Sequence, residues 1–161
     1  MATIEKYCAP GVYDTPSYSQ AIKVTNAQTI LFLAGQVPYA PDGTVNHIGD
    51  FMGQARQVFG AVKTLVEHAG GTLQNVVKIT TYVTDVRRRM DFRVVRDEFF
   101  GQRGPASTMI EVSSLSHPDY LIEHLDLEDL ARDRVYEFLF VAAPLKLTRA
   151  TGAPFAPLAL V

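Results

Sequence analysis

The sequence predicts an α+β domain in which two helices cover one face of a shared β-sheet. Residues 50–69 and 90–100 carry the spacing of amphipathic helices, and runs of β-branched residues lie between and after them. The predicted order of elements is β-β-α-β-α-β-β. Because each helix follows strand material and leads into another strand, both helices should pack on the same face of one sheet.

The first predicted elements are short strands joined by turns. Residues 1–20 are rich in proline, glycine and serine, and we expect an extended lead-in with room for a short strand. Residues 21–24 and 30–34 are apolar runs on either side of Asn26, the pattern of a β-hairpin. Residues 35–38 (GQVP) should end the second strand.

The clearest predicted helix covers residues 50–69. Its apolar residues recur three and four positions apart and form one stripe, which consists of Phe51, Ala55, Val58, Phe59, Val62, Leu65, Val66 and Ala69. The Gly70-Gly71 pair allows the left-handed turn that ends many helices. Residues 76–83 are rich in β-branched side chains and should form the next strand.

A shorter helix and two further strands complete the predicted domain. Residues 90–100 form the second helical segment, whose inner side carries Phe92, Val95, Phe99 and Phe100. Glycines at positions 101 and 104 should close this helix. Residues 108–113 are expected to form a strand, and residues 120–123 begin another.

The composition changes after residue 125, so we divide the chain into a domain of residues 1–125 and an extension of residues 126–161. Residues 126–139 are charged and have a helical period, which predicts a further helix. Residues 141–161 are apolar and interrupted by prolines, too often to form a membrane helix. We expect this tail to lie on a neighbouring subunit or to be partly disordered.

The overall composition favours a soluble cytoplasmic protein. Fifteen Lys and Arg against seventeen Asp and Glu give a net charge of −2 and a pI of about 6.1, without the basic stripe that nucleic-acid binding requires. No apolar run approaches the ~18–20 residues that span a membrane, and residues 1–6 lack the pattern of a signal peptide. The single cysteine, Cys8, cannot form an internal disulfide, which fits a reducing compartment.

Four segments of the chain together resemble one known family. They are residues 18–21 (YSQA), 34–38 (AGQVP), 76–85 (VVKITTYVTD) and 105–112 (PASTMIEV). In this order and spacing they are similar to the Rid/YjgF family of enamine and imine deaminases, also called endoribonuclease L-PSP or translation-inhibitor-like proteins. The resemblance covers residues 16–123.

The resemblance implies a chorismate-mutase-like fold, which is a mixed sheet backed by two helices. It also implies a homotrimer with three small-molecule pockets at the clefts between subunits. The implied reaction is hydrolysis of reactive enamines and imines, such as 2-aminoacrylate, to 2-keto acids and ammonia without a metal or cofactor. In the family an arginine holds the substrate carboxylate, and a glutamate near the last strand positions the attacking water.

Three residues match the cleft of this family. Tyr18 matches a tyrosine that lines the cleft, Gly35 a glycine whose backbone approaches the ligand, and Glu123 the water-handling glutamate. Ser107 stands at the position of the arginine, and Met109 stands where many members have a cysteine. A guanidinium holds a carboxylate through two charge-assisted hydrogen bonds, whereas a serine offers one neutral donor. A carboxylate substrate would therefore need another cation.

Arg93 is the candidate for that cation, because the family can place an asparagine that faces the cleft at this position of the second helix. The alternative is that Arg93 and Arg96 are solvated helix arginines, as most helix arginines are. Glu123 could likewise be a strand-edge carboxylate in water, and Tyr18 a packing aromatic. These alternatives stay open at the level of the sequence.

The remaining polar residues favour no other chemistry. The four histidines lack the spacing of a metal site, so we predict no metal and no cofactor. Residues 87–89, three arginines in a row, could contact RNA, but a solvated turn or an ion pair is the simpler interpretation. The sequence thus favours a Rid-like hydrolase or deaminase acting on an enamine, an imine or a related metabolite. A non-catalytic ligand-binding or chaperone-like member is the second hypothesis, and an endoribonuclease is the third.

Overall fold

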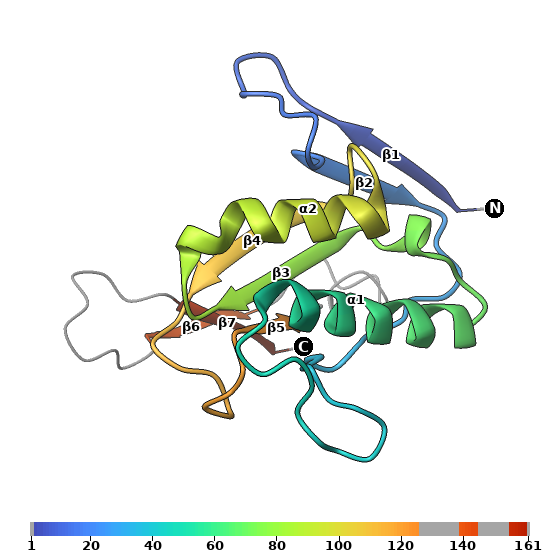
Figure 1. Ribbon diagram of the computed structural model, residues 1–161. Helices are drawn as coiled ribbons and strands as arrows, with labels where there is room; N and C mark the ends of the chain where they lie inside the picture. Colours follow the sequence, from blue (N-terminus) through green and yellow to red (C-terminus); the bar gives the residue numbers. More distant parts are fainter. Residues whose placement is uncertain (1, 126–138, 145–154, 161) are drawn as a thin grey trace. The chain divides into compact units, whose positions relative to one another are not determined.

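A computed structural model describes residues 2–125, 139–144 and 155–160 of the chain. The chain divides into two compact units, Met1–Leu127 and Glu128–Val161, and the first unit holds all the predicted site residues. The elements of the first unit are β1 (Thr3–Tyr7), β2 (Ala21–Thr25), α1 (Phe51–His68), β3 (Lys78–Val83), α2 (Arg89–Phe100), β4 (Ala106–Glu111) and β5 (Ile122–Leu125) (Figure 1). Two 3-10 turns, η1 (Leu73–Asn75) and η2 (Val86–Arg88), precede β3 and α2.

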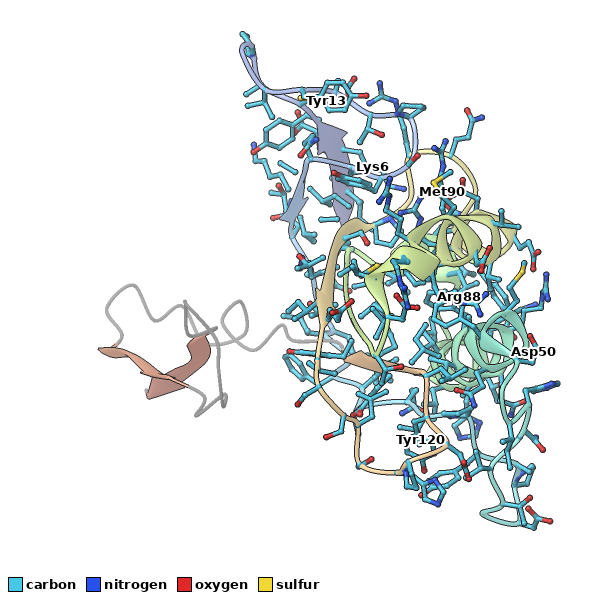
Figure 2. The ribbon with its side chains drawn as sticks, turned by 60° about the vertical axis from the view of Figure 1, so that its left-hand side comes forward. Lys6, Tyr13, Asp50, Arg88, Met90 and Tyr120 are labelled. Carbon is cyan, nitrogen blue, oxygen red and sulfur yellow. The ribbon has the colours of Figure 1, made fainter. Side chains whose placement is uncertain are left out.

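The central sheet of the first unit contains three strands in the order β4-β3-β5. β3 runs parallel to β4 on one side and antiparallel to β5 on the other. A parallel pair needs a crossover connection, and α2 forms it between β3 and β4. The first unit is therefore a mixed sheet backed by two helices (Figures 1 and 2), which confirms the predicted α+β fold.

The two long helices begin and end where their sequence signals predict. Asp50 caps α1, and its side chain accepts a hydrogen bond of 3.0 Å from the backbone N–H of Gly53. Gly70 and Gly101 follow the two helices with φ angles of 83° and 66°, in the left-handed region that favours glycine. Arg56 of α1 then joins Glu98 of α2 through two hydrogen bonds of 2.8 Å.

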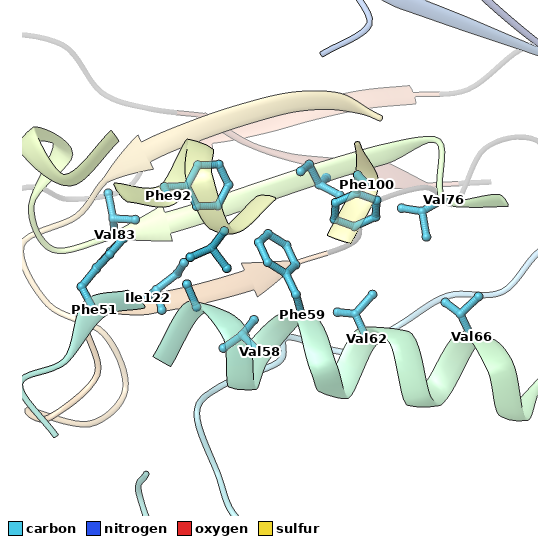
Figure 3. Close-up of a cluster of buried hydrophobic side chains, with 13 residues drawn as sticks. Phe51, Val58, Phe59, Val62, Val66, Val76, Val83, Phe92, Phe100 and Ile122 are labelled. Carbon is cyan, nitrogen blue, oxygen red and sulfur yellow. The ribbon is translucent and has the colours of Figure 1, made fainter. Parts of the chain in front are cut away.

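A single cluster of buried apolar side chains lies between the helices and the sheet (Figure 3). Phe59 of α1 is fully buried at the centre of this cluster. The centre of its ring lies 5.4 to 5.8 Å from the ring centres of four neighbours, which are Phe92, Phe99 and Phe100 of α2 and His124 of β5. Aromatic contacts of this kind add to the area that each ring buries.

The predicted hairpin between residues 21–24 and 30–34 is wrong. β2 pairs instead with β1, from Thr3 opposite Thr25 to Tyr7 opposite Ala21, and residues 30–34 form no strand with any described residue. Gln36 and His124 do pair, through hydrogen bonds of 2.8 and 3.1 Å. Short apolar runs therefore indicated extended backbone without indicating which strand each would join.

The extension contains strands that the sequence analysis did not predict. In the second unit, β6 (Leu139–Pro144) pairs antiparallel with β7 (Phe155–Leu160). Pro144 and Pro157 lie within these two strands, opposite Phe155 and Ala142. The helix predicted for residues 126–139 falls outside the described residues, apart from Leu139. In the described part of the chain, neither α-helix combines the length and hydropathy of a membrane crossing.

The Phe59 ring should dominate the stability of the first unit. Phe59→Ala leaves a cavity between both helices and β5, and we expect the free energy of unfolding to fall by about 3–5 kcal/mol. Leu65→Ala is the matched control on the same helix, because Leu65 is 40% exposed. Urea unfolding measures both values. Equal losses for the two variants would contradict this account of the core.

Candidate functional site

Tyr18 is held against the loop that leads into β4. Its neighbour Ser19 donates both its backbone N–H and its hydroxyl to the carbonyl of Gly104, at 3.1 and 2.7 Å. A Cβ atom at position 104 would lie 3.2 Å from the Cβ of Phe100, so the close approach of this loop to the end of α2 favours a glycine there. These contacts place the backbone of Tyr18 beside Gly104, two residues before β4 begins.

Arg96 reaches the Tyr18 ring from α2. The carbon atom of its guanidinium lies 5.8 Å from the centre of the Tyr18 ring and 5.9 Å from that of Phe92. The residue is only 4% exposed, and its Nε and Nη2 atoms donate to one oxygen of Asp97 at 3.2 and 2.8 Å. The structure therefore places a buried cation next to a predicted cleft residue.

The sequence analysis missed Arg96, although a signal was present. Arg96 is four positions from both Phe92 and Phe100, so it belongs to the inner stripe of α2. Arg93 is one position from Phe92 and lies on the outer side of the helix. Its Nε atom is 3.6 Å from Asp97, and 47% of its side chain is exposed. The role of Arg93 in binding stays a prediction, and no ring contact joins it to Tyr18 among the described residues.

Ser107 and Met109 lie on the helix-facing side of β4. Each is registered opposite a residue of β3 that is fully buried, Ile79 for Ser107 and Thr81 for Met109. Directly opposite residues of paired strands share a face of the sheet, so these four side chains point the same way. Met109 also packs against the apolar cluster. The Met109 side chain therefore packs in the core and is also a candidate for ligand contact.

Glu123 lies on β5, at the opposite side of the sheet from these residues. Its neighbours Ile122 and His124 are buried against the helices, so the Glu123 carboxylate must point to the other face. There it stands opposite Tyr82 and lines a hollow of about 300 Å³, whose other lining residues are Val112, Ser114, Leu115 and Ser116. Burial raises the pKa of the Glu123 carboxyl, as suits a general base.

Gly35 lies near this second group. Its neighbour Gln36 is paired through the backbone with His124, which directly follows Glu123. Beside the same strand, the Tyr120 hydroxyl is fully buried and has no hydrogen-bond partner among the described residues. Burial raises the pKa of this phenol and keeps it neutral.

His124 is part of the core. It is 2% exposed, its ring lies against Phe59, and its Nδ1 atom is 3.4 Å from the Thr81 hydroxyl. Burial lowers the pKa of His124 to about 4, so the imidazole is neutral near pH 7.

The arginine run and the possible metal ligands of the sequence form no further site in the described residues. Arg87 pairs with Asp85 at 2.8 Å and Arg88 with Asp91 at 3.1 Å, in agreement with ion pairs rather than an open phosphate-binding surface. In the described residues no group of three or more His, Cys, Asp and Glu side chains could hold a metal ion. A larger open hollow of about 720 Å³ lies along α1 and includes none of the predicted site residues.

The predicted residues, with Arg96 added and Arg93 left out, form two half-sites at the two outer strands of the sheet. The first half-site, beside β4, contains Tyr18, Arg96, Ser107 and Met109, and the second, beside β5, contains Gly35 and Glu123. Because β3 lies between them, the outer strands are about 10 Å apart. Their side chains also point to opposite faces. One protomer thus separates the groups that a single cleft would need.

Comparison with known proteins identifies the family. The family described as Endoribonuclease L-PSP matches residues 12–124 of this chain. The chain belongs to the Rid/YjgF family. A RutC family protein of Pyrococcus abyssi is 41% identical over 106 residues, which cover 66% of this chain and 80% of the relative. Protein HMF1 of Saccharomyces cerevisiae is 30% identical over 118 residues, which cover 73% of this chain and 85% of the relative.

Solved structures of Rid proteins share the fold. The Rid family protein YyfB of Yersinia pestis, described as a protein of unknown function, has a TM-score of 0.69 and 26% identity over 75% of this chain and 94% of that chain. RidA from the Antarctic bacterium Psychrobacter has a TM-score of 0.54 and 30% identity over 73% of this chain and 87% of that chain. The predicted family and fold are therefore confirmed, while the roles of individual site residues stay predictions.

This Rid family chain should become less stable as the pH falls from about 6.5 to 4. An unfolded histidine gains a proton near its ordinary pKa of 6.5, whereas burial lowers the pKa of His124 to about 4. The unfolded state then binds more protons in this range. His124 should therefore make the free energy of unfolding rise with pH by up to about 1.4 kcal/mol per pH unit, about 3 kcal/mol in all. Urea unfolding at several pH values measures this slope.

Two variants isolate the contribution of His124. His124→Leu should lose that part of the slope, and His68→Asn, which removes an exposed histidine at the end of α1, should keep it. Glu123 acts in the opposite direction, because a raised pKa makes its ionisation lower the stability as the pH rises. The slopes of the His124→Leu variant and its parent are therefore also compared in proteins that carry Glu123→Gln, which removes the contribution of Glu123. Equal slopes for the His124→Leu variant and its parent would contradict the prediction.

Proposed function

We propose that this Rid family protein hydrolyses an enamine or imine of a small metabolite at a cleft between two subunits. The observation that carries the proposal is the separation of the two half-sites. Tyr18 and Arg96 lie beside one outer strand, and Glu123 lies beside the other on the opposite face. A cleft that uses both needs one half-site from each of two chains.

A ring of subunits would bring the half-sites together. If the β4 side of one protomer meets the β5 side of the next, every interface is identical and head-to-tail, and such interfaces close into a ring when the rotation between neighbours is a whole fraction of a turn. Family resemblance favours a ring of three. Each interface would then carry Tyr18 from one chain and Glu123 from its neighbour.

Glu123 is suited to activate water in this cleft. A carboxylate in a partly dry hollow holds a proton more strongly than one in water, so it is a better base. It accepts a proton from water while the oxygen attacks the imine carbon. The carbinolamine that forms then loses ammonia, and a carbonyl compound remains. The water molecule supplies the oxygen of the product and two of the hydrogens of ammonia, so the reaction needs no oxidant or metal.

Ser107 favours a second candidate function. Without an arginine on β4, the chain could bind a small metabolite without turning it over, or act as a chaperone-like member of the family. An endoribonuclease has less support, because Arg87 and Arg88 are already paired with carboxylates. The catalytic and non-catalytic proposals differ in whether ammonia is released.

The catalytic proposal is tested with imines generated in situ by an amino-acid oxidase. The parent protein should accelerate ammonia release, and Glu123→Gln should slow kcat by about 100- to 10,000-fold, because the base that receives the proton is lost. Glu67→Gln on the exposed side of α1 is the matched control and should be fully active. A parent without activity on any imine supports the non-catalytic candidate. Full activity in Glu123→Gln would remove this residue from the mechanism.

Mixed assemblies test the shared cleft. Tyr18→Ala and Glu123→Gln each inactivate a different half-site, so either variant alone should be inactive. When the two are unfolded and reassembled together at equal amounts, trimeric rings should regain about one quarter of the parent activity, because each mixed ring has one intact cleft. Light scattering should give a mass of three chains of 17.8 kDa. Activity that never exceeds the sum of the separate variants would show that both residues act within one chain.

A further inference from the structure

We propose that Arg96 binds the anionic group of the ligand, so that α2 supplies the cation which Ser107 does not. This inference deepens the proposed function, because it names small carboxylates as the ligand class of the first half-site. It assigns a role to a residue that the sequence analysis did not select. The proposal follows from the contacts of Arg96, its unused donors, its local charge and its position.

The Arg96 guanidinium is preorganised for binding, because its side chain is buried beside two aromatic rings. The side chain is 5% exposed, and its Cζ atom lies 5.8 Å from the centre of the Tyr18 ring and 5.9 Å from that of the Phe92 ring. Both distances lie within the range of about 6 Å for cation–π attraction, which is stronger for a guanidinium removed from water. A preorganised guanidinium loses little entropy when it binds a carboxylate.

The hydrogen bonds of Arg96 leave part of this group unused. Nε and Nη2 both donate to the same oxygen of Asp97, and Nη1 makes no hydrogen bond with any described residue. A guanidinium has five N–H donors. Nη1 is not among the fully buried polar atoms that lack a partner in the described residues, so it keeps contact with solvent and is open to a ligand. A ligand carboxylate beside Tyr18 would satisfy the Nη1 side.

The local charge also favours an anion. The Asp97 carboxylate is shared by two arginines, since its second oxygen lies 3.6 Å from Nε of Arg93. The three side chains together carry one net positive charge. In a site of low dielectric, such an excess attracts a small anion more strongly than it would in water.

The position of Arg96 places it on the correct side of β4. Tyr18 is bridged to Gly104, two residues before β4 begins, and Arg96 contacts the Tyr18 ring. Ser107 faces the helix side of the same strand, as its register opposite Ile79 requires. Both Arg96 and Ser107 therefore lie on the helix side of the β4 edge, and a cation lost from the strand is available from the helix.

The first experiment measures binding, which does not depend on turnover. Pyruvate, the simplest 2-keto acid, is titrated into the assembled protein. Arg96→Gln should weaken pyruvate binding by about 10- to 100-fold, the loss expected for charge-assisted hydrogen bonds. Arg87→Gln is the matched control, because it removes an exposed arginine that is paired with Asp85 and lies outside this half-site. It should change the affinity by less than about twofold. Equal affinities in Arg96→Gln and the parent would overturn the proposal.

A second measurement avoids substitution at the buried position altogether. In the unsubstituted protein, the assigned guanidinium NMR signal of Arg96 should shift on pyruvate titration, and that of Arg87 should not. This readout decides the proposal even where Arg96→Gln fails to fold. An unmoved Arg96 signal at saturating pyruvate would overturn it.

A substrate comparison and a rescue variant separate anion binding from a merely structural role. Arg96→Gln should raise KM for an imino acid and leave kcat/KM for an imine without a carboxylate unchanged. Adding Ser107→Arg to Arg96→Gln should restore the affinity, because it returns a guanidinium to the same side of β4. Equal losses for both substrates with no rescue would assign Arg96 to folding alone.

The two proposals fail in different ways. A parent that binds pyruvate through Arg96 and releases no ammonia overturns the hydrolase proposal and keeps the anion site. A parent that releases ammonia with an unchanged KM in Arg96→Gln overturns the anion site and keeps the hydrolase.

Discussion

The packing of Phe59 sets the positions of the groups that matter for function. This one ring contacts three aromatic residues of α2 and the His124 ring of β5, so it joins both helices to the sheet. Once Phe92 and Phe100 are turned toward Phe59, the helical period brings Arg96 to the inner side of α2. Once His124 is turned toward the same ring, the strand alternation sends Glu123 to the opposite face. An apolar contact thus decides where a cation and a carboxylate lie.

The side chains that the proposed function uses therefore lie at two opposite edges of one sheet. The first half-site combines a phenol with a guanidinium, and the second combines a half-buried carboxylate with a hollow lined by Tyr82 and serines. Neither half-site alone has both a group for holding an anion and a base for water. In the proposed function, assembly unites these groups at a subunit interface, because the fold keeps them apart within one chain.

Ser107 stands where the family has an arginine, and a neighbouring element can supply the missing cation. A carboxylate site needs a guanidinium at the right position, and either a strand or a helix can carry that guanidinium. Strand β4 and helix α2 both border the segment that carries Tyr18, so either can supply the cation. A family motif read only along one strand would miss such a transfer, since the new residue is 11 positions away in the sequence.

The sequence by itself determined the elements whose periodicity is local. The stripe of α1 predicts a helix because each apolar residue meets its neighbours three and four positions away, and the β-branched run predicts β3 for a similarly local reason. The family motifs likewise depend on residues that are close in sequence, and they indicated Tyr18, Gly35 and Glu123.

Tertiary structure decided which strands pair and which of the two arginines on α2 lies beside Tyr18. It joined β2 to β1 instead of to residues 30–34, and it selected Arg96 over Arg93 as the arginine beside Tyr18. It also set Glu123 on the face away from Ser107. These outcomes depend on contacts between distant segments, and the free energy of such contacts is not encoded in the spacing of either segment alone.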